Sequence, residues 1–487
     1  MRLSSRILVA GAFLLLGFLV HQATIPYAAP RTDEPSPLPD IIFVEALQVN
    51  SGEVACRFPR GSRLKRISPA SPARSEINLT PELYAAADPD VSADGTRVAF
   101  SGKANRKSPW QIWEMNVDGS HKHQVTHGDS DCLRPAYLPR NEIVYSCSDW
   151  KESAAESTLF VAKADGANPR PITFGPGDFQ VETVLSEGRI LISAHSSLVS
   201  SARKGIQRAL FTIRPDGTGL TRYRPNAREN LIESGIQELQ NGTVVFVVKD
   251  DPASPSPGGM LARIRRGSSH NSLITPQQSA YWSARELQGD TLIVSKANAP
   301  SGAKHGTFDL YTFDLTSRKL GKLLYHNPEF SSVEAAAIKP RPQARYYWSI
   351  LHLQHKTGRV ICLNAYLSVD APSGRISTPI ERVRVLTLDS ARPGESVLGE
   401  APVETDGSFY VTAPADRPLR FELLDAKGNV IRAQRSWVWT RPGEDLGCLG
   451  CHDDKAMAPP NHWPLALKRL DTPIALGGTR TTGTAGH

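Results

Sequence analysis

The chain has 487 residues, of which 40% are hydrophobic and 22% charged, a composition that excludes a disordered or fibrous protein. Its formal net charge is +7, and no dense Lys/Arg run is interleaved with aromatic residues, so nucleic acid is not expected as a partner. Gly and Pro number 37 each, and this turn-rich composition favours many short strands over long helices.

Residues 1–29 predict an export signal, with an uncleaved anchor as the alternative. Arg2 and Arg6 precede an apolar run over residues 7–20 that is too short for a comfortable membrane span, and cleavage is expected near Ala29. We therefore expect a periplasmic or otherwise extracytoplasmic protein, which contacts a membrane only if the segment stays uncleaved. Residues 30–40 are Pro-rich and indicate a linker.

Residues 41–354 contain an internal repeat. Turn signals flanked by short apolar strands recur about every 46 to 54 residues, near the period of propeller blades. A second series, at Asp118-Gly119, Asp165-Gly166 and Asp216-Gly217, adds a second hairpin to three of these periods, giving four strands per period. The repeat predicts a mainly β fold with a six- or seven-bladed propeller, closed by early strands near residues 41–47 and 63–67. An irregular all-β solenoid is the alternative.

The repeats stop after residue 342, and shorter strands follow. Residues 355–440 predict a small β-sandwich-like domain with turns at Asp406-Gly407 and Lys427-Gly428. We expect a short haem-binding segment over residues 441–470 and a disordered Gly/Thr-rich tail over residues 471–487.

The haem prediction rests on the pentapeptide Cys448-Leu449-Gly450-Cys451-His452. In this C-x-x-C-H pattern, Cys448 and Cys451 form thioethers to one haem c, and His452 reaches the iron as axial ligand. A zinc site and a redox-active dithiol are alternatives, but a fourth zinc ligand is not evident and a βαβ setting is absent. His462 and Met457 are candidates for the sixth iron position, although a surface role is slightly favoured for His462.

Cysteine and histidine side chains also cluster in the repeat region. Cys132 and Cys147 lie nearly equidistant from a turn at residues 139–141, and this spacing fits either a disulfide across two strands or two buried thiols. His121, His123 and His127 are clustered along a polar strand and turn, and we interpret them as surface residues rather than a metal site.

The first repeat unit, with "DPDVSADGTRVAFSGK" and "WQIWEMNVDG", resembles the repeats of TolB-type (WD40-like) propellers. Together with "DGSFYVTAPAD", "RFELLDAKG" and "CLGCHDD", it resembles hydrazine synthase alpha subunits, middle domain included, over about residues 40–461. The resemblance implies haem at Cys448 and Cys451 with His452 in the motif position. Asp453 stands where the family commonly has Glu, and the chain ends about 35 residues after the motif without a second C-x-x-C-H.

The leading functional hypothesis from sequence is an exported monohaem protein that transfers electrons, with the propeller docking a redox or scaffold protein partner. A haem enzyme with an open iron site at the propeller face, and a TolB-like binding module with structural haem, are the alternatives. The sequence leaves open whether the chain is an enzyme, possibly an oxidoreductase, and no catalytic residue is identified. Hydrazine synthesis itself is not expected, because multi-electron chemistry between haems needs more than one haem motif.

Overall fold

The computed structural model describes residues 37–47, 49, 58, 61–70, 76–148, 156–195, 208–223, 231–249, 258–265, 268, 272–276, 280–298, 307–368, 371, 373–389, 392–434, 436–450 and 461–476. The expected export signal lies outside these residues. None of the described residues forms an apolar helix of membrane-spanning length. The described part of the chain is almost entirely β-structure, with one short 3-10 helix at Leu465–Leu467.

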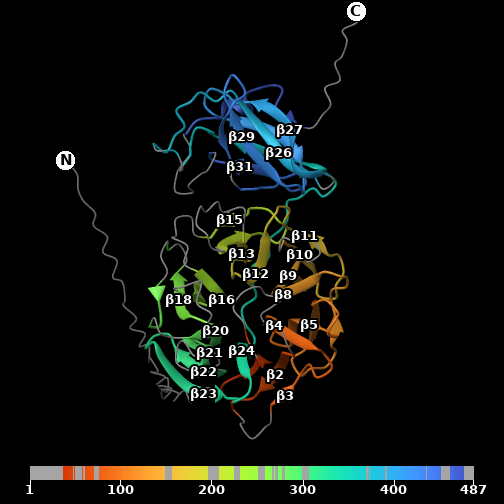
Figure 1. Cartoon of the computed structure of the whole chain (residues 1–487), viewed down its shortest axis with the longest axis vertical. Helices are drawn as coiled ribbons and strands as arrows, with labels where there is room; N and C mark the ends of the chain where they lie inside the picture. Colours follow the sequence, from red (N-terminus) through yellow and green to blue (C-terminus); the bar gives the residue numbers. More distant parts are fainter. Residues whose placement is uncertain are drawn as a thin grey trace, which may run out of the picture. The chain divides into compact units, whose positions relative to one another are not determined.

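Within the described residues, the strands up to residue 338 form six four-stranded units, two of which join into one eight-stranded sheet through a parallel contact between Ser157 and Asp178 (Figure 1). Their first strands contact one another in sequence, and the last contacts the first, so the units close into a propeller ring. The six units are β4 (Ala85–Val91), β5 (Arg97–Lys103), β6 (Gln111–Asn116) and β7 (His123–Gln124); β8 (Asp131–Leu138), β9 (Glu142–Ser148), β10 (Ser157–Lys163) and β11 (Arg170–Pro171); β12 (Asp178–Val184), β13 (Ile190–His195), β14 (Arg208–Ile213) and β15 (Thr221–Arg222); β16 (Leu231–Glu238), β17 (Thr243–Lys249), β18 (Met260–Arg265) and β19 (Ser272–Leu273); β20 (Tyr281–Gln288), β21 (Thr291–Ala297), β22 (Phe308–Asp314) and β23 (Lys319–Tyr325); β24 (Ser331–Ile338), β1 (Asp40–Ala46), β2 (Arg63–Ile67) and β3 (Ile77–Asn78).

The ring is closed by strands from the two ends of the repeat region, as the sequence predicts. β1 pairs antiparallel with β24, so the N-terminal strands complete the blade that the last repeat begins. This pairing hides two sheet edges that would otherwise expose unpaired backbone groups. Residues 41–44 are fully buried in it, which explains why this early segment is an unbroken apolar run.

β-Bulges in the first strands of the blades bring charged side chains from different blades together. Asp88 and Arg134 adopt positive φ values of 52° and 55° at such bulges. Arg134 lies 2.8 Å from a carboxylate oxygen of Glu182, and its backbone N–H faces a carboxylate oxygen of Asp88 at 3.3 Å. A buried ion pair and a hydrogen bond to a carboxylate thus hold neighbouring blades together in addition to apolar packing.

The repeated Asp-Gly turns share one hydrogen-bond pattern. In four of them a carboxylate oxygen of the Asp accepts from both the backbone N–H and the hydroxyl of the residue two positions on, namely Asp94 with Thr96, Asp118 with Ser120, Asp216 with Thr218 and Asp406 with Ser408. Asp165 accepts only the backbone N–H of Ala167, because alanine has no hydroxyl. The Asp side chain therefore stabilises each turn, and the Gly that follows it in sequence adopts the positive φ that the turn requires.

We expect Asp94→Ala to cost about 1 kcal/mol of unfolding free energy, because its carboxylate also accepts from the Ser92 hydroxyl. These hydrogen bonds lower the pKa of Asp94 from 3.8 to about 2. The contribution is therefore present above pH 4 and is lost as the pH falls toward 2. Urea denaturation at pH 7 measures the cost. Asp165→Ala is the matched control, and an equal loss in both variants would contradict this account.

Cys132 and Cys147 lie directly opposite each other on β8 and β9 and are joined in a disulfide. The sequence left a disulfide and two thiols open, and the structure has the disulfide. The hairpin turn lies at residues 139–141, as predicted.

The C-terminal strands form two four-stranded sheets whose inner faces share one apolar core, which confirms the predicted β-sandwich. The sandwich extends past its predicted end at residue 440, because two later short strands join it in parallel pairings. The prediction of disorder is wrong for residues 471–476, where Ile474 pairs with Val411 and Leu476 is buried in the core. The two sheets are β27 (Arg392–Pro402), β26 (Arg382–Asp389), β29 (Leu419–Leu424) and β30 (Val430–Ala433), and β31 (Asp445–Cys448), β25 (Thr357–Cys362), β28 (Phe409–Pro414) and β32 (Ile474–Ala475).

Candidate functional site

The segment over residues 437–441 connects the sandwich to the propeller. Trp439 is buried among propeller residues, stacks edge-on against Phe174 and Phe179, and donates its indole N–H to the carbonyl of Gly217 at 3.0 Å. Arg441 donates to the carbonyl of Asp216 at 2.8 Å, and its guanidinium lies over the Phe174 ring. This docking segment leads directly into the strand that carries the first motif cysteine.

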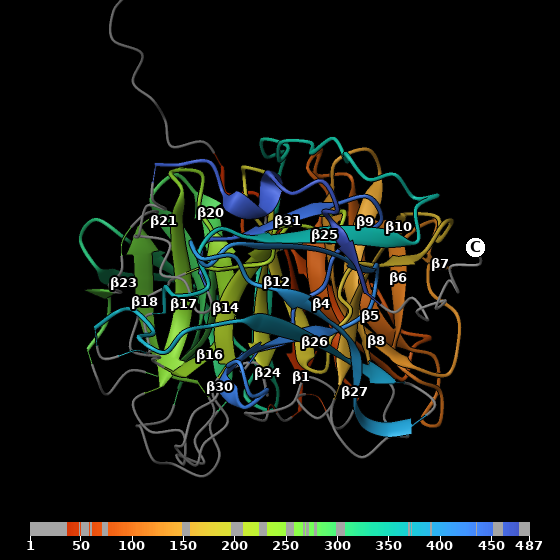
Figure 2. The same cartoon turned by 90° about the horizontal axis from the view of Figure 1, so that it is seen from above.

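Cys448 is the last residue of β31, which runs parallel to β25 (Figure 2). In this register Cys448 lies opposite the buried Cys362, and its carbonyl accepts the N–H of Leu363 at 2.9 Å. The side chain of Cys448 is half-buried. Two positions on, a Cβ atom at Gly450 would lie 2.5 Å from the carbonyl oxygen of Leu367, so this position excludes a side chain. The first part of the motif is therefore rigidly held.

The rest of the predicted haem site is described only in part. Cys451, His452 and Met457 lie outside the described residues. His462 is described and is exposed, with Nδ1 3.4 Å from the carbonyl of Trp463 and 3.9 Å from a carboxylate oxygen of Asp406. These contacts are those of a surface imidazole.

A cavity of about 560 Å³, here called the junction cavity, lies at the opposite end of the β25–β31 pair. Asp445 begins β31 and lines the cavity, so with about 3.3 Å per residue the cavity is roughly 10 Å along the strand from Cys448. Most of the lining residues are polar or charged, and they come from the propeller, the sandwich and the chain between them: Arg214, Thr218, Ile350, His352, His355, Thr357, Gly358, Arg359, Thr412, Gly443, Glu444 and Asp445.

Glu444 is the buried acid of the junction cavity. Its carboxylate accepts the N–H of Arg441 at 2.8 Å within a tight turn. Burial, together with the negative charge of Asp216, raises the pKa of Glu444 from 4.5 to about 7, although the Arg441 N–H and the charges of Arg441 and Arg214 oppose this. A carboxyl group with such a pKa exchanges protons near neutral pH, as general acids and bases do.

Two imidazoles line the same cavity. His352 donates its backbone N–H to the carbonyl of Pro442 at 3.1 Å, and the rings of His352 and His355 lie 5.4 Å apart and nearly parallel. His352 packs closely against Gly443, where a Cβ atom would lie only 3.0 Å from the Cβ of His352. The histidines and Glu444 thus face one polar space close to the cysteine motif.

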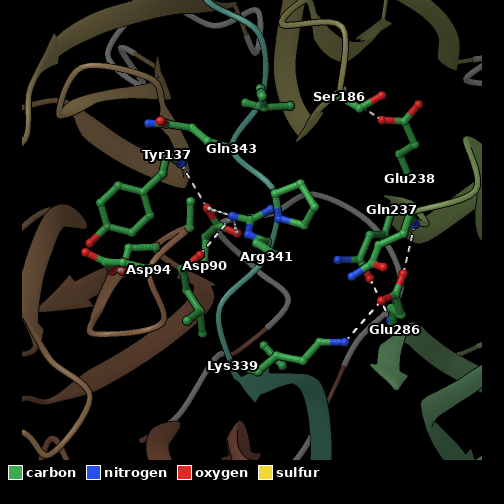
Figure 3. A pocket seen from close by; sticks show the side chains of 18 of the residues that line it. Asp90, Asp94, Tyr137, Ser186, Gln237, Glu238, Glu286, Lys339, Arg341 and Gln343 are labelled. Atoms are coloured by element: carbon green, nitrogen blue, oxygen red, sulfur yellow. Dashed lines mark hydrogen bonds and ion pairs between the residues drawn. The ribbon is translucent and has the colours of Figure 1, made fainter. Parts of the chain in front are cut away.

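A second cavity, of about 380 Å³, lies between the blades and the chain that follows β24 (Figure 3). Four of the eight charged residues that line it pair with one another. Arg341 lies 3.3 Å from both carboxylate oxygens of Asp90, and Lys339 lies 3.1 Å from Glu286. Because these charges already compensate each other, the junction cavity is the stronger candidate for a ligand site.

The histidine cluster of the propeller is on the surface, as the sequence predicts. His121, His123 and His127 are exposed, and His123 is 3.7 Å from Glu114. Among the described residues, no group of three or more His, Cys, Asp or Glu side chains is placed to hold a metal ion.

Sequence reasoning missed the junction cavity. Arg214, His352 and Glu444 come from a propeller turn, the connecting chain and a sandwich turn, and no local motif links them. The usable signal was the abrupt passage from the sandwich through Arg441-Pro442-Gly443-Glu444 into the cysteine motif.

Comparison with known proteins supports the resemblance. Residues 379–453 match the family described as hydrazine synthase alpha subunit middle domain. The hydrazine synthase subunit alpha of Kuenenia stuttgartiensis is 22% identical over 560 aligned positions, covering 88% of this chain and 67% of the relative. The solved hydrazine synthase of the same organism matches 89% of this chain and 72% of its own, with a TM-score of 0.75 and 20% identity. TolB from Acinetobacter baumannii covers 62% of this chain and 67% of its own, with 12% identity and a TM-score of 0.44.

These relatives correct the leading functional hypothesis. An electron-transfer protein that uses the propeller only as a docking scaffold is contradicted, because the relative that matches most of the chain is a subunit of an enzyme. The electron-transfer hypothesis rested on the single C-x-x-C-H motif and gave less weight to the arrangement of the domains. The chain has the fold of hydrazine synthase, and its sandwich carries the sequence signature of the alpha subunit's middle domain.

Proposed function

We propose that this chain is a subunit of an oxidoreductase that converts small nitrogen compounds, in the manner of the hydrazine synthase alpha subunit. The observation that carries the proposal is the similarity to that subunit over 88% of the chain, including propeller, sandwich and motif. As an alpha-type subunit it would work with a protein partner. The apolar N-terminal run and the Cys132–Cys147 disulfide favour an exported, oxidising location.

The proposed cofactor is one haem c, held by Cys448 and Cys451 with His452 on the iron. The described part of the motif fits this role, since Cys448 is half-buried at the end of a strand and its backbone is hydrogen-bonded to Leu363. When bound, haem supplies an iron centre for redox chemistry on small ligands. His462 and Met457 remain candidates for the sixth position.

The chain's own residues would handle protons. Glu444 has a pKa of about 7 because it is buried, so it holds a proton below neutrality and releases it above. The strand β31 connects it rigidly to Cys448. Joining two one-nitrogen compounds requires proton transfers to the leaving oxygen, and we propose Glu444 as a group that supplies such protons.

Replacing Cys448 and Cys451 together with alanine is expected to abolish covalent haem, because both thioether bonds are lost. The measurement is a pyridine haemochrome spectrum with intact-mass spectrometry, on protein expressed with c-type maturation machinery. One haem per wild-type chain is expected. The pair Cys132→Ala and Cys147→Ala is the control and should retain its haem. Wild-type protein with stoichiometric zinc, or with a Cys448–Cys451 disulfide in place of haem, would refute the cofactor assignment.

The reaction class is tested by supplying ammonium and hydroxylamine to the haem-loaded chain with its partner subunits. Their condensation forms an N–N bond, breaks the N–O bond and releases water, so atoms and electrons balance without an added reductant. Hydrazine above the level of the heat-inactivated complex supports the proposal. A haem-loaded complex that forms no hydrazine and neither oxidises nor reduces hydroxylamine contradicts it.

A further inference from the structure

Two arginine side chains, Arg189 and Arg214, converge beside the junction cavity, and neither forms an ion pair with a carboxylate among the described residues. A Cβ atom built on Gly219 would lie 3.7 Å from Nε of Arg214 and 3.8 Å from an Nη of Arg189, so both guanidinium groups meet over this glycine. Burial and the positive charge of Arg214 lower the pKa of Arg189, and the negative charge of Glu187 offsets this only in part. Two like charges at this distance repel each other unless a negative charge compensates them.

The described residues offer these guanidinium groups few acceptors. Arg189 donates one Nη to the carbonyls of Thr212 and Gly219 and to the Thr221 hydroxyl. Arg214 lies over the ring of Tyr347 at 5.6 Å, and within the described chain it forms no side-chain hydrogen bond or ion pair. Nε of both arginines is buried without a partner. Buried, unpaired donors of a charged group are costly, so a ligand that supplies an acceptor to them would be bound favourably.

Of these two arginines, Arg214 lines the junction cavity. The other cation on that wall, Arg359, is already paired with Asp445. The remaining acid, Glu444, is protonated over part of the neutral range, because burial raises its pKa to about 7. Arg214 is therefore a lining guanidinium without an ion pair among the described residues, and the cavity volume of about 560 Å³ is in the range of small-ligand sites, roughly 300–1,000 Å³.

We infer that the junction cavity binds a small anion through a carboxylate or oxyanion group, with Arg214 as the primary contact and Arg189 behind it. A guanidinium group suits such ligands, because its planar donors match two oxygen atoms at once. Anion binding requires neither haem nor the proposed reaction, so the anion site and the proposed function can be tested independently.

The test is isothermal titration of the full chain with nitrite, succinate and phosphate, at an ionic strength held constant with chloride. Thermal unfolding runs in parallel, because a ligand that binds only the folded state raises the melting temperature. At least one of the three probes should bind and stabilise the wild type more than chloride does. If none of them does so, the inference is wrong.

Arg214→Gln should weaken binding of that probe by about 10-fold or more, since a charge-assisted contact is lost. Its melting temperature without ligand should not fall, because the substitution removes a repulsive charge. Arg359→Gln is the matched control on the same wall and should change affinity by less than about 3-fold, because Asp445 already pairs with it. Should Arg214→Gln fail to fold, Arg214→Lys keeps the charge but loses the planar fork and should still bind more weakly. Wild-type affinity in a folded Arg214 variant would overturn the assignment.

Discussion

Replacing Trp439 with alanine is expected to destabilise the protein by about 3–5 kcal/mol, the range for removing a large buried aromatic side chain. Trp439 is 5% exposed and packs edge-on against two propeller phenylalanines. Its removal leaves a cavity between propeller and sandwich. It also leaves the carbonyl of Gly217 without the indole N–H that it accepts. Urea denaturation at pH 7, followed by intrinsic fluorescence, measures the loss.

Two variants separate packing from hydrogen bonding at this position. Trp439→Phe keeps an aromatic ring against Phe174 and Phe179 but loses the donor to Gly217, so a cost of about 1–2 kcal/mol is expected. Trp348→Ala removes a side chain that is 73% exposed and should change stability by about 0.5 kcal/mol or less. Equal losses for Trp439→Ala and Trp348→Ala would show that the docking segment does not hold the two domains together.

The propeller could be predicted because its signals are local. The Asp-Gly turns carry their own hydrogen bonds, as at Asp94 and Asp216, and they repeat with the period of a blade. The apolar run at residues 41–44 lies outside the repeat units, and closure of the ring by its pairing with β24 accounts for it. The disulfide stayed undecided, because distance from the turn does not fix which side of a strand each cysteine faces.

The late strands and the junction cavity could not be predicted in this way. β31 and β32 have only four and two residues, too few for a period to be recognised, and they form strands by pairing with the parallel edges of β25 and β28. Arg214 and Glu444 are separated by more than two hundred residues, and the docking of Trp439 and Arg441 brings them near each other. The chemistry of the site therefore depends on an interface between domains, which no sequence motif encodes.

Glu444→Gln is expected to make the protein more stable above neutral pH, by about 3 kcal/mol at pH 8. The pKa of folded Glu444 is raised to about 7 from its ordinary 4.5, mainly by burial. Between these pH values the unfolded chain releases a proton that the folded chain keeps, so the stability of the wild type falls as the pH rises through this window. Glutamine has nearly the same shape, still accepts the Arg441 N–H and carries no charge at any pH.

The difference in unfolding free energy between the wild type and Glu444→Gln should depend on pH. The two proteins should be about equally stable at pH 4, where Glu444 is protonated in both states, and should diverge progressively up to pH 8. Denaturation midpoints at pH 4, 5, 6, 7 and 8 trace the curve. Asp445→Asn removes the neighbouring exposed acid, which is paired with Arg359, and should show no such gain. A constant difference across this range would mean that Glu444 titrates normally and would remove the case for its role as a proton relay. A divergence centred between pH 4.5 and 7 would instead show that the fold maintains a buried acid beside the cysteine motif at a cost in stability, as expected of a residue kept for chemistry.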